Sequence, residues 1–290
     1  MADIGISGTL YIVATPIGNL EDMTYRAVRV LAEVSVIACE DTRQSHKLLE
    51  HVGIRKPTVS FHEYNEKERS AELIAQLERG DDIALISDAG TPMISDPGYR
   101  LVRDAVARNI RVVPIPGPSA VIAALSASGL PTDSFRFAGF LPPKSGARRR
   151  VLESLRDDSS TLVFYEAPHR IIECLQDVAA VMGTREVVVA RELTKIHEEF
   201  IRGTAESVMR ELSSRPALKG EITLLIAKSD RIVEQTGSIR EDVEMLERAG
   251  VTRMDAMKQV ARERGISKRE VYAEMEKKAG VHSGRRPSQP

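Results

Sequence analysis

Short apolar runs rich in β-branched residues recur along the first part of this chain, separated by stretches with helical periodicity. The runs are Leu10–Ala14, Val34–Cys39, Ile83–Ile86 and Val112–Ile115. Apolar residues at helical spacing occupy Ala71–Arg79, between the second and third runs, and Gly98–Arg108, between the third and fourth. This alternation of strand and helix predicts a parallel sheet flanked by helices, so we expect residues 8 to about 120 to form an α/β domain.

A second α/β domain is expected after Leu130–Lys144, a segment rich in Pro, Gly and Phe that we interpret as a crossing linker. Runs with the composition of strands, and segments with helical periodicity, follow it. The strands are Leu162–Tyr165, Glu186–Ala190, Glu199–Arg202 and Ile222–Ala227, and the helices are Ile171–Val181 and Ala205–Leu212. Because the second and third of these strands follow each other closely, we expect an antiparallel or mixed sheet.

The last part of the chain is strongly charged and helical from about Ile239. Helices are predicted at Asp255–Glu263 and Lys268–Lys277, joined by a Gly-containing turn that ends at Ser267. Ser267 can cap the last helix, and Glu270 stands at the position that a capping box requires. Such a pair of helices resembles a helix-turn-helix, although most helical hairpins contact protein rather than nucleic acid.

The length of 290 residues and the hydrophobic content of 42% allow more than one core. We expect an N-terminal α/β domain at 1–122, a C-terminal α/β domain at 123–230, and a helical extension with a basic tail at 231–290. No segment has the pattern of a signal peptide or a bilayer-spanning helix, so a cytoplasmic location without a membrane partner is expected. Cys39 and Cys174 lie far apart and form no Cys-x-x-Cys pair, so we expect neither a metal site nor a structural disulfide.

The formal net charge of −1 speaks against a nucleic-acid partner, because proteins that bind phosphates usually carry an excess of Lys and Arg. Local basic segments would have to supply the contacts, and two candidates are Lys144–Arg150 (KSGARRR) and Gly284–Pro287 (GRRP). On charge alone, a solvated loop and a disordered chain end are the favoured interpretations of these segments.

The loops after the strands of the first domain carry the functional signal, because ligands of open α/β sheets bind beyond the carboxyl ends of the strands. Thr15–Leu20 follows the first strand and lacks the Gly-x-Gly-x-x-Gly pattern of dinucleotide-binding folds, which disfavours dehydrogenases and Rossmann-type methyltransferases. In a later loop, Gly90 allows close backbone approach to a ligand, and Asp88 offers a carboxylate to an ammonium or a ribose hydroxyl. Ser119 either caps the helix that it precedes or leaves the helix amino end to bind a carboxylate.

Acidic and basic side chains gather at the ends of three further apolar runs, at Glu40–Arg43, Tyr165–Arg170 and Arg191–Lys195. A salt-bridged domain interface would explain such clusters, and so would a ligand site. Because these clusters at strand ends exceed what packing needs, we favour a site.

Several of these segments together carry a resemblance to a known family. They are LYIVATPIGNLED (Leu10–Asp22), ACEDTR (Ala38–Arg43), SDAGTPMISDPG (Ser87–Gly98), PGPSA (Pro116–Ala120), FAGFLPPK (Phe137–Lys144), FYEAPHR (Phe164–Arg170) and RELTK (Arg191–Lys195). With them, residues 9 to about 228 resemble the ribosomal RNA small subunit methyltransferase I family, ribose 2′-O-methyltransferases of the tetrapyrrole methylase superfamily. The helical end is also similar to the additional C-terminal domain of that family.

The resemblance implies two α/β domains of tetrapyrrole-methylase type that hold S-adenosylmethionine in the cleft between them, and commonly a homodimer. It implies a cytidine of small-subunit (16S) ribosomal RNA as the target, in free RNA or in the 30S subunit. The cofactor contacts that it implies are Pro16, Asp88, Gly90, Thr91, Ser119, Ala120, Glu166 and Ala167. The first loop, Thr15–Leu20, contains less Gly than is frequent in the superfamily, which suggests a different substrate and leaves the role of Pro16 open.

A ribose hydroxyl is a weak nucleophile, so a carboxylate or imidazole within hydrogen-bond reach would assist its methylation. The candidate bases are Asp41, Glu40 and Glu166, followed by His62 and His169. An equally good interpretation makes Glu40 and Asp41 structural partners of Arg43. The basic residues nearest to the motifs are the candidates for RNA phosphate contacts, namely Arg43, Lys144, Arg148, Arg149 and Arg150.

Two other functions stay open at this point. One is a small-molecule methylase that acts on a tetrapyrrole or corrinoid precursor, and the other is a catalytically idle RNA-binding assembly factor. The helical segment at 239–278 argues against the first, since a small substrate needs no such appendage. The aromatic content of 4%, without Trp, offers few stacking platforms to either kind of substrate and does not separate them.

Overall fold

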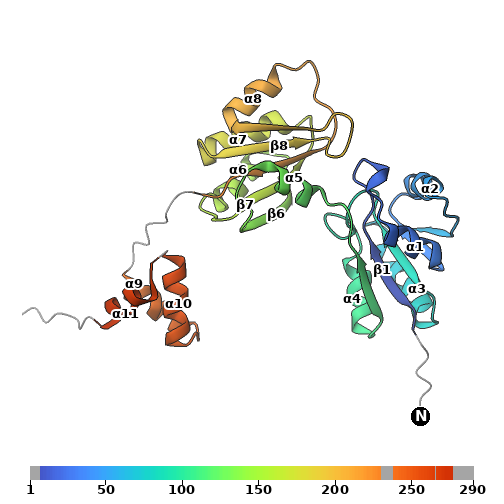
Figure 1. Ribbon diagram of the computed structural model, residues 1–290, viewed down its shortest axis with the longest axis horizontal. Helices are drawn as coiled ribbons and strands as arrows, with labels where there is room; N and C mark the ends of the chain where they lie inside the picture. Colours follow the sequence, from blue (N-terminus) through green and yellow to red (C-terminus); the bar gives the residue numbers. More distant parts are fainter. Residues whose placement is uncertain (1–6, 230–237, 265, 277–290) are drawn as a thin grey trace, which may run out of the picture. The chain divides into compact units, whose positions relative to one another are not determined.

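The computed structural model describes residues 7–229, 238–264 and 266–276. The contacts between residues divide the chain into two units, Met1–Asp230 and Arg231–Pro290. The first unit contains two five-stranded sheets, each with helices on both faces, and the second contains three helices (Figure 1). The expected fold class, two α/β domains with a small helical domain, is confirmed.

The first sheet is entirely parallel, with the strand order β3-β2-β4-β1-β5. Its strands are β1 (Thr9–Val13), β2 (Val36–Cys39), β3 (Thr58–Ser60), β4 (Ile83–Ile86) and β5 (Arg111–Ile115). The central strand β4 is apolar throughout because both of its faces are covered. Its side chains alternate between two cores, with Ile83 and Leu85 in one and Ala84 and Ile86 in the other.

Helices cover both faces of this sheet. They are the 3-10 helix η1 (Leu20–Asp22) and the α-helices α1 (Tyr25–Glu33), α2 (Thr42–His51), α3 (Glu66–Glu78) and α4 (Tyr99–Ala107). Leu73 of α3 and Leu101 of α4 share one core, whereas Leu31 of α1 and Leu49 of α2 share the other. The layered arrangement leaves the loops at the carboxyl ends of the strands as the part of the domain that can bind a ligand.

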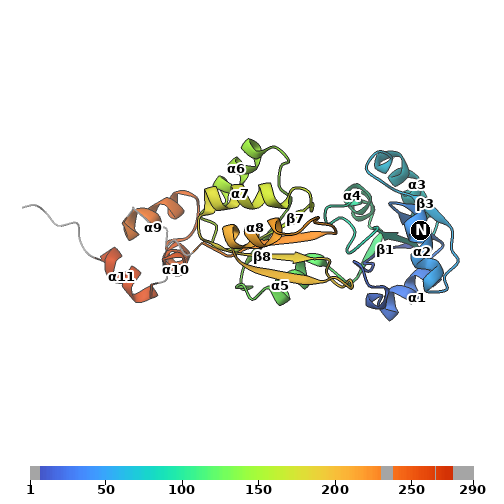
Figure 2. The ribbon, with the colours of Figure 1, turned by 90° about the horizontal axis from the view of Figure 1, so that it is seen from above.

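The second sheet is mixed, with the order β6-β7-β10-β8-β9. Its strands are β6 (Phe135–Phe140), β7 (Thr161–Glu166), β8 (Glu186–Arg191), β9 (Glu199–Thr204) and β10 (Ile222–Ile226). The pair β6 and β7 is parallel and the other pairs are antiparallel, as expected of a mixed sheet. The helices α6 (Ser145–Ser154), α7 (Ile171–Met182) and α8 (Ala205–Ser213) pack on one face, and α5 (Ala120–Ser128) packs on the other (Figure 2).

Two sequence expectations about this domain are wrong. Leu130–Lys144 is not a plain linker, because it contains β6, an edge strand whose pairing with β7 shifts register between Phe137 and Phe140. Edge strands are exposed on one side and irregular, so their composition is close to that of a loop. The basic segment Lys144–Arg150 is not a loop either, since α6 begins at Ser145. The helix α5 packs against the second sheet, and the boundary after residue 122, which stays a prediction, lies within this helix.

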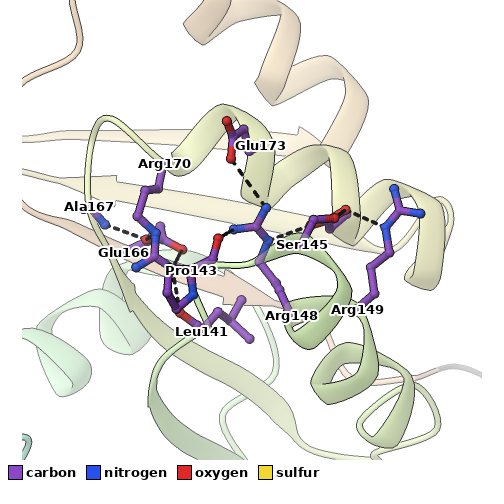
Figure 3. Close-up of polar contacts among 10 residues, drawn as sticks. Leu141, Pro143, Ser145, Arg148, Arg149, Glu166, Ala167, Arg170 and Glu173 are labelled. Atoms are coloured by element: carbon purple, nitrogen blue, oxygen red, sulfur yellow. Dashed lines mark hydrogen bonds and ion pairs between the residues drawn. The ribbon is translucent and has the colours of Figure 1, made fainter.

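A buried ion-pair cluster explains why α6 carries so many arginines (Figure 3). Arg148 is 1% exposed, and its Nε donates to Oδ2 of the buried Asp177 on α7 at 2.6 Å. Arg149 Nε and Ser145 Oγ both donate to the other oxygen of Asp177, at 2.6 and 2.9 Å. Burial opposes ionisation of this carboxyl, but the hydrogen bonds from Arg149, Arg148 and Ser145 outweigh burial and lower the pKa of Asp177.

The expectation that Arg148 contacts RNA phosphate is therefore wrong, because its side chain is buried and neutralised by Asp177. Its Nη2 also lies 3.8 Å from Oε2 of Glu173, and its Nη1 donates to the Pro143 carbonyl at 3.3 Å. The cluster joins α6 to α7 and so belongs to the fold of the second domain.

The second unit consists of α9 (Ile239–Arg248), α10 (Arg253–Glu263) and α11 (Lys268–Glu276), packed around a small apolar core. The predicted capping box of the last helix is confirmed, since Glu270 N donates to Ser267 Oγ at 3.2 Å and Ser267 N donates to Glu270 Oε2 at 2.7 Å. The basic tail Gly284–Pro287 and Lys277, which was expected in the last helix, lie outside the described residues.

We predict that Asp177→Asn destabilises the protein by about 3–5 kcal/mol, because it leaves the buried Arg148 charge without its counter-charge. The measurement is the urea unfolding midpoint followed by circular dichroism. Glu33→Gln, which removes an ion pair between half-exposed side chains on α1, should cost less than about 1 kcal/mol. In the Arg148→Met background the loss caused by Asp177→Asn should be smaller, and strictly additive losses would contradict the prediction.

Candidate active site

Three loops at the carboxyl end of the first sheet are joined by hydrogen bonds. Thr15, after β1, and Gly90, after β4, exchange two backbone hydrogen bonds, with N to O distances of 2.9 and 3.0 Å. Thr15 Oγ1 also donates to the Ser87 carbonyl at 3.1 Å. Thr91 Oγ1 donates to the carbonyl of Pro118, after β5, at 3.4 Å. The loops that follow β1, β4 and β5 therefore form one continuous wall.

A cavity of about 400 Å³ lies between this wall and the strand ends of the second domain. The first domain lines it with Ile17, Ala89, Gly90, Thr91, Ile94, Ser95, Asp96, Ser119 and Ala120. The second domain lines it with Phe140, Tyr165, Glu166, Ala167, Pro168, Ala190, Leu193, Gly220, Glu221, Ile222 and Thr223. A largely apolar, partly open cavity with a few polar groups is typical of a site for a small organic ligand.

Most of the residues that the sequence marks as cofactor contacts meet at this cavity. They are Gly90, Thr91, Ser119, Ala120, Glu166 and Ala167. Pro16 is buried beside the lining residue Ile17 but does not itself line the cavity. Asp88 is exposed outside the lining, where its Oδ1 accepts a hydrogen bond from Asp41 N at 3.1 Å and so joins the loops after β2 and β4.

The amino end of α5 opens into the cavity. Ser119 is its N-cap residue, with extended backbone angles, but the Ser119 side chain makes no capping hydrogen bond. The first backbone N–H groups of a helix have no partner within the helix, and their dipoles favour an anion. Ser119 and Ala120 line the cavity, so this helix end can bind a carboxylate there.

Comparison with known proteins places the chain in a family. Residues 9–209 match the family model of tetrapyrrole (corrin/porphyrin) methylases. A ribosomal RNA small subunit methyltransferase I from Halalkalibacterium halodurans is 48% identical over 271 residues, which cover 91% of this chain and 93% of the relative. The protein of the same name from Pseudomonas aeruginosa is 51% identical over 224 residues, covering 76% and 79%. This chain belongs to the ribosomal RNA small subunit methyltransferase I family.

Solved structures of other methylases have the same fold. A diphthine synthase matches with a TM-score of 0.61 at 15% identity, covering 77% of this chain and 91% of that one. A uroporphyrin-III-C-methyltransferase from Thermus thermophilus matches with a TM-score of 0.55 at 21% identity, covering 76% and 94%. The resemblance that the sequence motifs predict is thus confirmed at the level of family and fold.

The candidate bases of this family member lie in different surroundings. Asp41 caps α2 and accepts hydrogen bonds from Arg43 N at 2.8 Å and Arg43 Nε at 3.2 Å. The hydrogen bonds from the Arg43 side chain and backbone lower the pKa of Asp41, which makes this carboxylate a weak base. Of the two interpretations left open for Asp41, the structure supports the partner of Arg43. Neither Asp41 nor Arg43 lines the cavity.

Glu166 lines the cavity, and its side chain is fully buried and held by neighbours (Figure 3). Its Oε1 accepts from Ala167 N at 2.8 Å and lies 3.2 Å from Arg170 Nε. Arg170 Nη2 donates in turn to the Leu141 carbonyl at 2.6 Å. These contacts give the Glu166 carboxylate a structural role, which disfavours the expected role of Glu166 as a base. Glu166 instead fixes the backbone of Ala167 against the cavity.

Asp96 is a carboxylate of the cavity lining that the sequence analysis did not select. It lies in the loop between β4 and α4 and lines the cavity. Burial and the negative charge of Glu40 raise the pKa of Asp96 to about 6, with a smaller contribution from Asp88, while the hydrogen bond of Ser87 opposes the shift. Burial and the charge of Asp88 also raise the pKa of Glu40, although Glu40 does not line the cavity. The available signal was a second acid in the motif Ser87–Gly98.

The histidine candidates lie elsewhere. His62 follows β3, where its Nε2 is 3.4 Å from Nδ2 of Asn65, and His169 is exposed beyond the end of β7. Neither imidazole lines the cavity. Among the described residues, no group of three or more His, Cys, Asp or Glu side chains could hold a metal ion. In the same part of the chain, no helix has both the length and the apolar composition to cross a bilayer.

Strained backbone borders the cavity on both sides. Met93 and Ser95, in the loop after β4, have φ angles of 72° and 68°. Glu192 and Thr194, in the loop after β8, have φ angles of 53° and 67°. Positive φ is uncommon for residues other than glycine and gathers at functional sites, where the surrounding structure enforces it. The two loops are therefore held in fixed shapes next to the cavity.

We predict that the Asp96 carboxyl titrates with a midpoint near 6 and that Glu40→Gln lowers this midpoint toward the ordinary aspartate value. The reason is that the substitution removes the like charge that disfavours ionisation of Asp96. Carboxyl ¹³C NMR over pH 3–9 measures the midpoint, and the signal that Asp96→Asn removes is the signal of Asp96. A shift of one pKa unit corresponds to about 1.4 kcal/mol. Glu33→Gln, remote on α1, is the matched control. A midpoint unmoved by Glu40→Gln would contradict the charge coupling.

Proposed function

We propose that this protein transfers a methyl group from S-adenosylmethionine to the 2′-hydroxyl of a cytidine ribose in small-subunit (16S) ribosomal RNA. The observation that carries the proposal is the cavity at the strand ends of both domains, in a chain that belongs to this methyltransferase family. Its volume of about 400 Å³ lies in the range of sites for ligands of nucleoside size.

The residues that line the cavity fit the chemical groups of the cofactor. The uncapped amino end of α5 suits the carboxylate of a methionine moiety. Asp96 and Glu221 supply negative charge for a sulfonium, and apolar side chains such as Ile17 and Leu193 exclude water. We include Gly90, Thr91, Ser119, Ala120, Glu166 and Ala167 among the cofactor contacts, with Pro16 and Asp88 acting through the loops that they shape. The bound cofactor would supply the electrophilic methyl group.

Binding in such a cavity raises the rate of methyl transfer because it orients the reacting groups. Methyl transfer needs the acceptor oxygen in line with the bond that breaks, and a rigid pocket provides that alignment. The strained loops around Ser95 and Thr194 keep the pocket walls in one conformation. Expulsion of water protects the sulfonium and strengthens the polar contacts that remain.

Three further parts of the proposal concern surroundings and partners. The acceptor is small-subunit RNA or the 30S particle, the enzyme works in the cytoplasm, and two copies form a homodimer. Sedimentation equilibrium of the purified chain measures its mass in solution, and the mass of a monomer would contradict the homodimer.

We predict that the protein transfers label from methyl-labelled S-adenosylmethionine to 30S subunits or free 16S RNA, and not to a precorrin pool. The labelled nucleotide should resist alkaline cleavage at its 3′ phosphodiester, because a 2′-O-methyl group blocks attack by that oxygen. Gly90→Val is the inactive control, since Gly90 lines the cavity at a φ of 79° that a β-branched residue does not adopt. Label in the precorrin pool would favour the small-molecule methylase, and no label anywhere would favour the idle assembly factor.

RNA contacts are proposed at the basic residues that remain accessible. Lys144, before α6, and Arg150, within it, are exposed. Among the described residues, the hydrogen bond of the Arg150 side chain is the one that Nε donates to the Gly146 carbonyl at 3.2 Å. Arg149 is half-exposed but is engaged by Asp177, and the 87% exposed side chain of Arg43 is engaged by Asp41. We therefore place the stronger phosphate contacts at Lys144 and Arg150.

We predict that Lys144→Ala with Arg150→Ala weakens RNA binding and lowers the slope of log affinity against log salt by about one unit for each phosphate interaction that the substitutions remove. The measurement is filter binding to 16S RNA between low and high salt. The matched control, Arg29→Ala, removes an exposed arginine that pairs with Glu33 on α1 and should leave the slope unchanged. A double variant with the wild-type slope would assign these residues to a solvated surface.

A further inference from the structure

The lining of the cavity contains three carboxylates, and their partners differ. Glu166 is held by Arg170, and Glu221 Oε2 accepts from Lys195 Nζ at 3.0 Å. Within residues 7–229, Asp96 is the lining carboxylate for which no ion pair with a Lys or Arg is found. A general base needs a lone pair that no cation occupies. On this criterion Asp96 differs from Asp41 and Glu166, which pair with arginines, and it differs from Glu40 in lining the cavity.

The loop that carries Asp96 is fixed at both ends. At its start the Ser87 hydroxyl donates to the backbone carbonyls of Ala89 and Gly90, at 3.3 and 3.5 Å. At its end, Glu66 Oε1 on α3 accepts from Gly98 N at 3.1 Å and from Arg100 N at 3.2 Å. The residue before Asp96 is held at a φ of 68°. The loop therefore holds the backbone of Asp96 in a defined position, which a catalytic group needs.

Groups from both domains face Asp96. On the first domain these are Glu40, after β2, and Asp88, after β4. On the second domain it is Tyr165 of β7, whose pKa is raised by burial and then by the charges of Asp96 and Glu221. The rings of Phe137 and Phe140 hold the Tyr165 ring, with centroids 4.9 and 5.6 Å away. Asp96, from the loop after β4, and Tyr165, from β7, thus line the same cavity from different domains.

We propose that Asp96 is the general base of the methyl transfer and that the acceptor hydroxyl is bound between its carboxylate and the Tyr165 hydroxyl. This assignment rests on the proposed function. The O–H bond of the ribose breaks and its proton passes to an oxygen of Asp96. The acceptor oxygen forms a bond to the methyl carbon while the bond from that carbon to sulfur breaks, and the electron pair of that bond stays on sulfur as a neutral thioether. Asp96 then releases the proton to water.

The surroundings of Asp96 suit this task. An ordinary aspartate is too weak a base to assist a hydroxyl well, and base strength rises with pKa. Burial and the charges of Glu40 and Asp88 raise the basicity of Asp96, yet it stays ionised near neutral pH. Its charged form is active, so methyl transfer should be fast above the midpoint near 6 and should fall tenfold per pH unit below it.

The test compares Asp96→Asn with the wild-type protein in single-turnover methyl transfer to the small-subunit RNA, with labelled S-adenosylmethionine at saturation, from pH 5 to 8. We expect a loss of about 100-fold or more at pH 7.5 and the disappearance of the pH dependence below 6.5. Affinity for S-adenosylhomocysteine, measured by calorimetry, should stay within about threefold of wild type. The matched control is Asp104→Asn on α4, where the carboxylate pairs with Arg103 at the surface, and it should keep the wild-type rate and profile.

Each of the other outcomes overturns a different part of the proposal. Labelled RNA from Asp96→Asn at a rate and pH profile like those of the wild type overturns the general base and leaves the proposed function in place. A large loss of S-adenosylhomocysteine affinity with the rate retained at saturation makes Asp96 a cofactor contact instead of a base. Absence of label with the wild-type protein overturns the proposed function, and the assignment of Asp96 with it.

Discussion

The pair of backbone hydrogen bonds between Thr15 and Gly90 is the constraint on which the site depends. These bonds join the loops that follow two neighbouring strands of a parallel sheet, β1 and β4, whose ends would otherwise separate. Gly90 is favoured there because its φ is 79°, a conformation that residues with a Cβ rarely adopt. Once the two loops are fixed, Thr91 reaches the loop after β5, and the wall of the cavity is complete.

The two domains differ in how the charges near the cavity are neutralised. In the second domain, charges are neutralised locally, as in the pairs of Glu166 with Arg170 and of Lys195 with Glu192 and Glu221. In the first domain, Glu40 and Asp96 stay close to each other without such neutralisation, which is why both pKa values are raised. Negative charge favours a sulfonium, whose positive charge disappears during transfer. If Asp96 takes the proton, the negative charge falls in the same step, so the cavity keeps its charge balance.

The sequence predicts best what depends on local pattern. Apolar runs such as Ile83–Ile86 indicate buried parallel strands, and residues directly after them, such as Gly90 and Ser119, meet at the cavity. What it misses depends on partners distant in the chain. The strand Phe135–Phe140 is an irregular edge strand, so its pattern is weak. Arg148 has its counter-charge 29 residues away on another helix. The pKa of Asp96 is raised by burial and by Glu40, which follows a different strand. Periodicity carries no record of such contacts.

The near-neutral charge of the chain gives a misleading view of its capacity to bind RNA. Many of its cations are consumed inside the fold, since Arg148 and Arg149 pair with Asp177, and Arg191 and Arg215 pair with Glu199. An RNA phosphate can bind only those cationic side chains that are solvated and not paired within the protein. The number of counterions released on binding is proportional to the number of such contacts. Binding through a few such residues would be weak and only moderately dependent on salt. Selectivity would then come from the shape of the RNA and from the cavity that receives one ribose, and the net charge of the protein would have little influence on it.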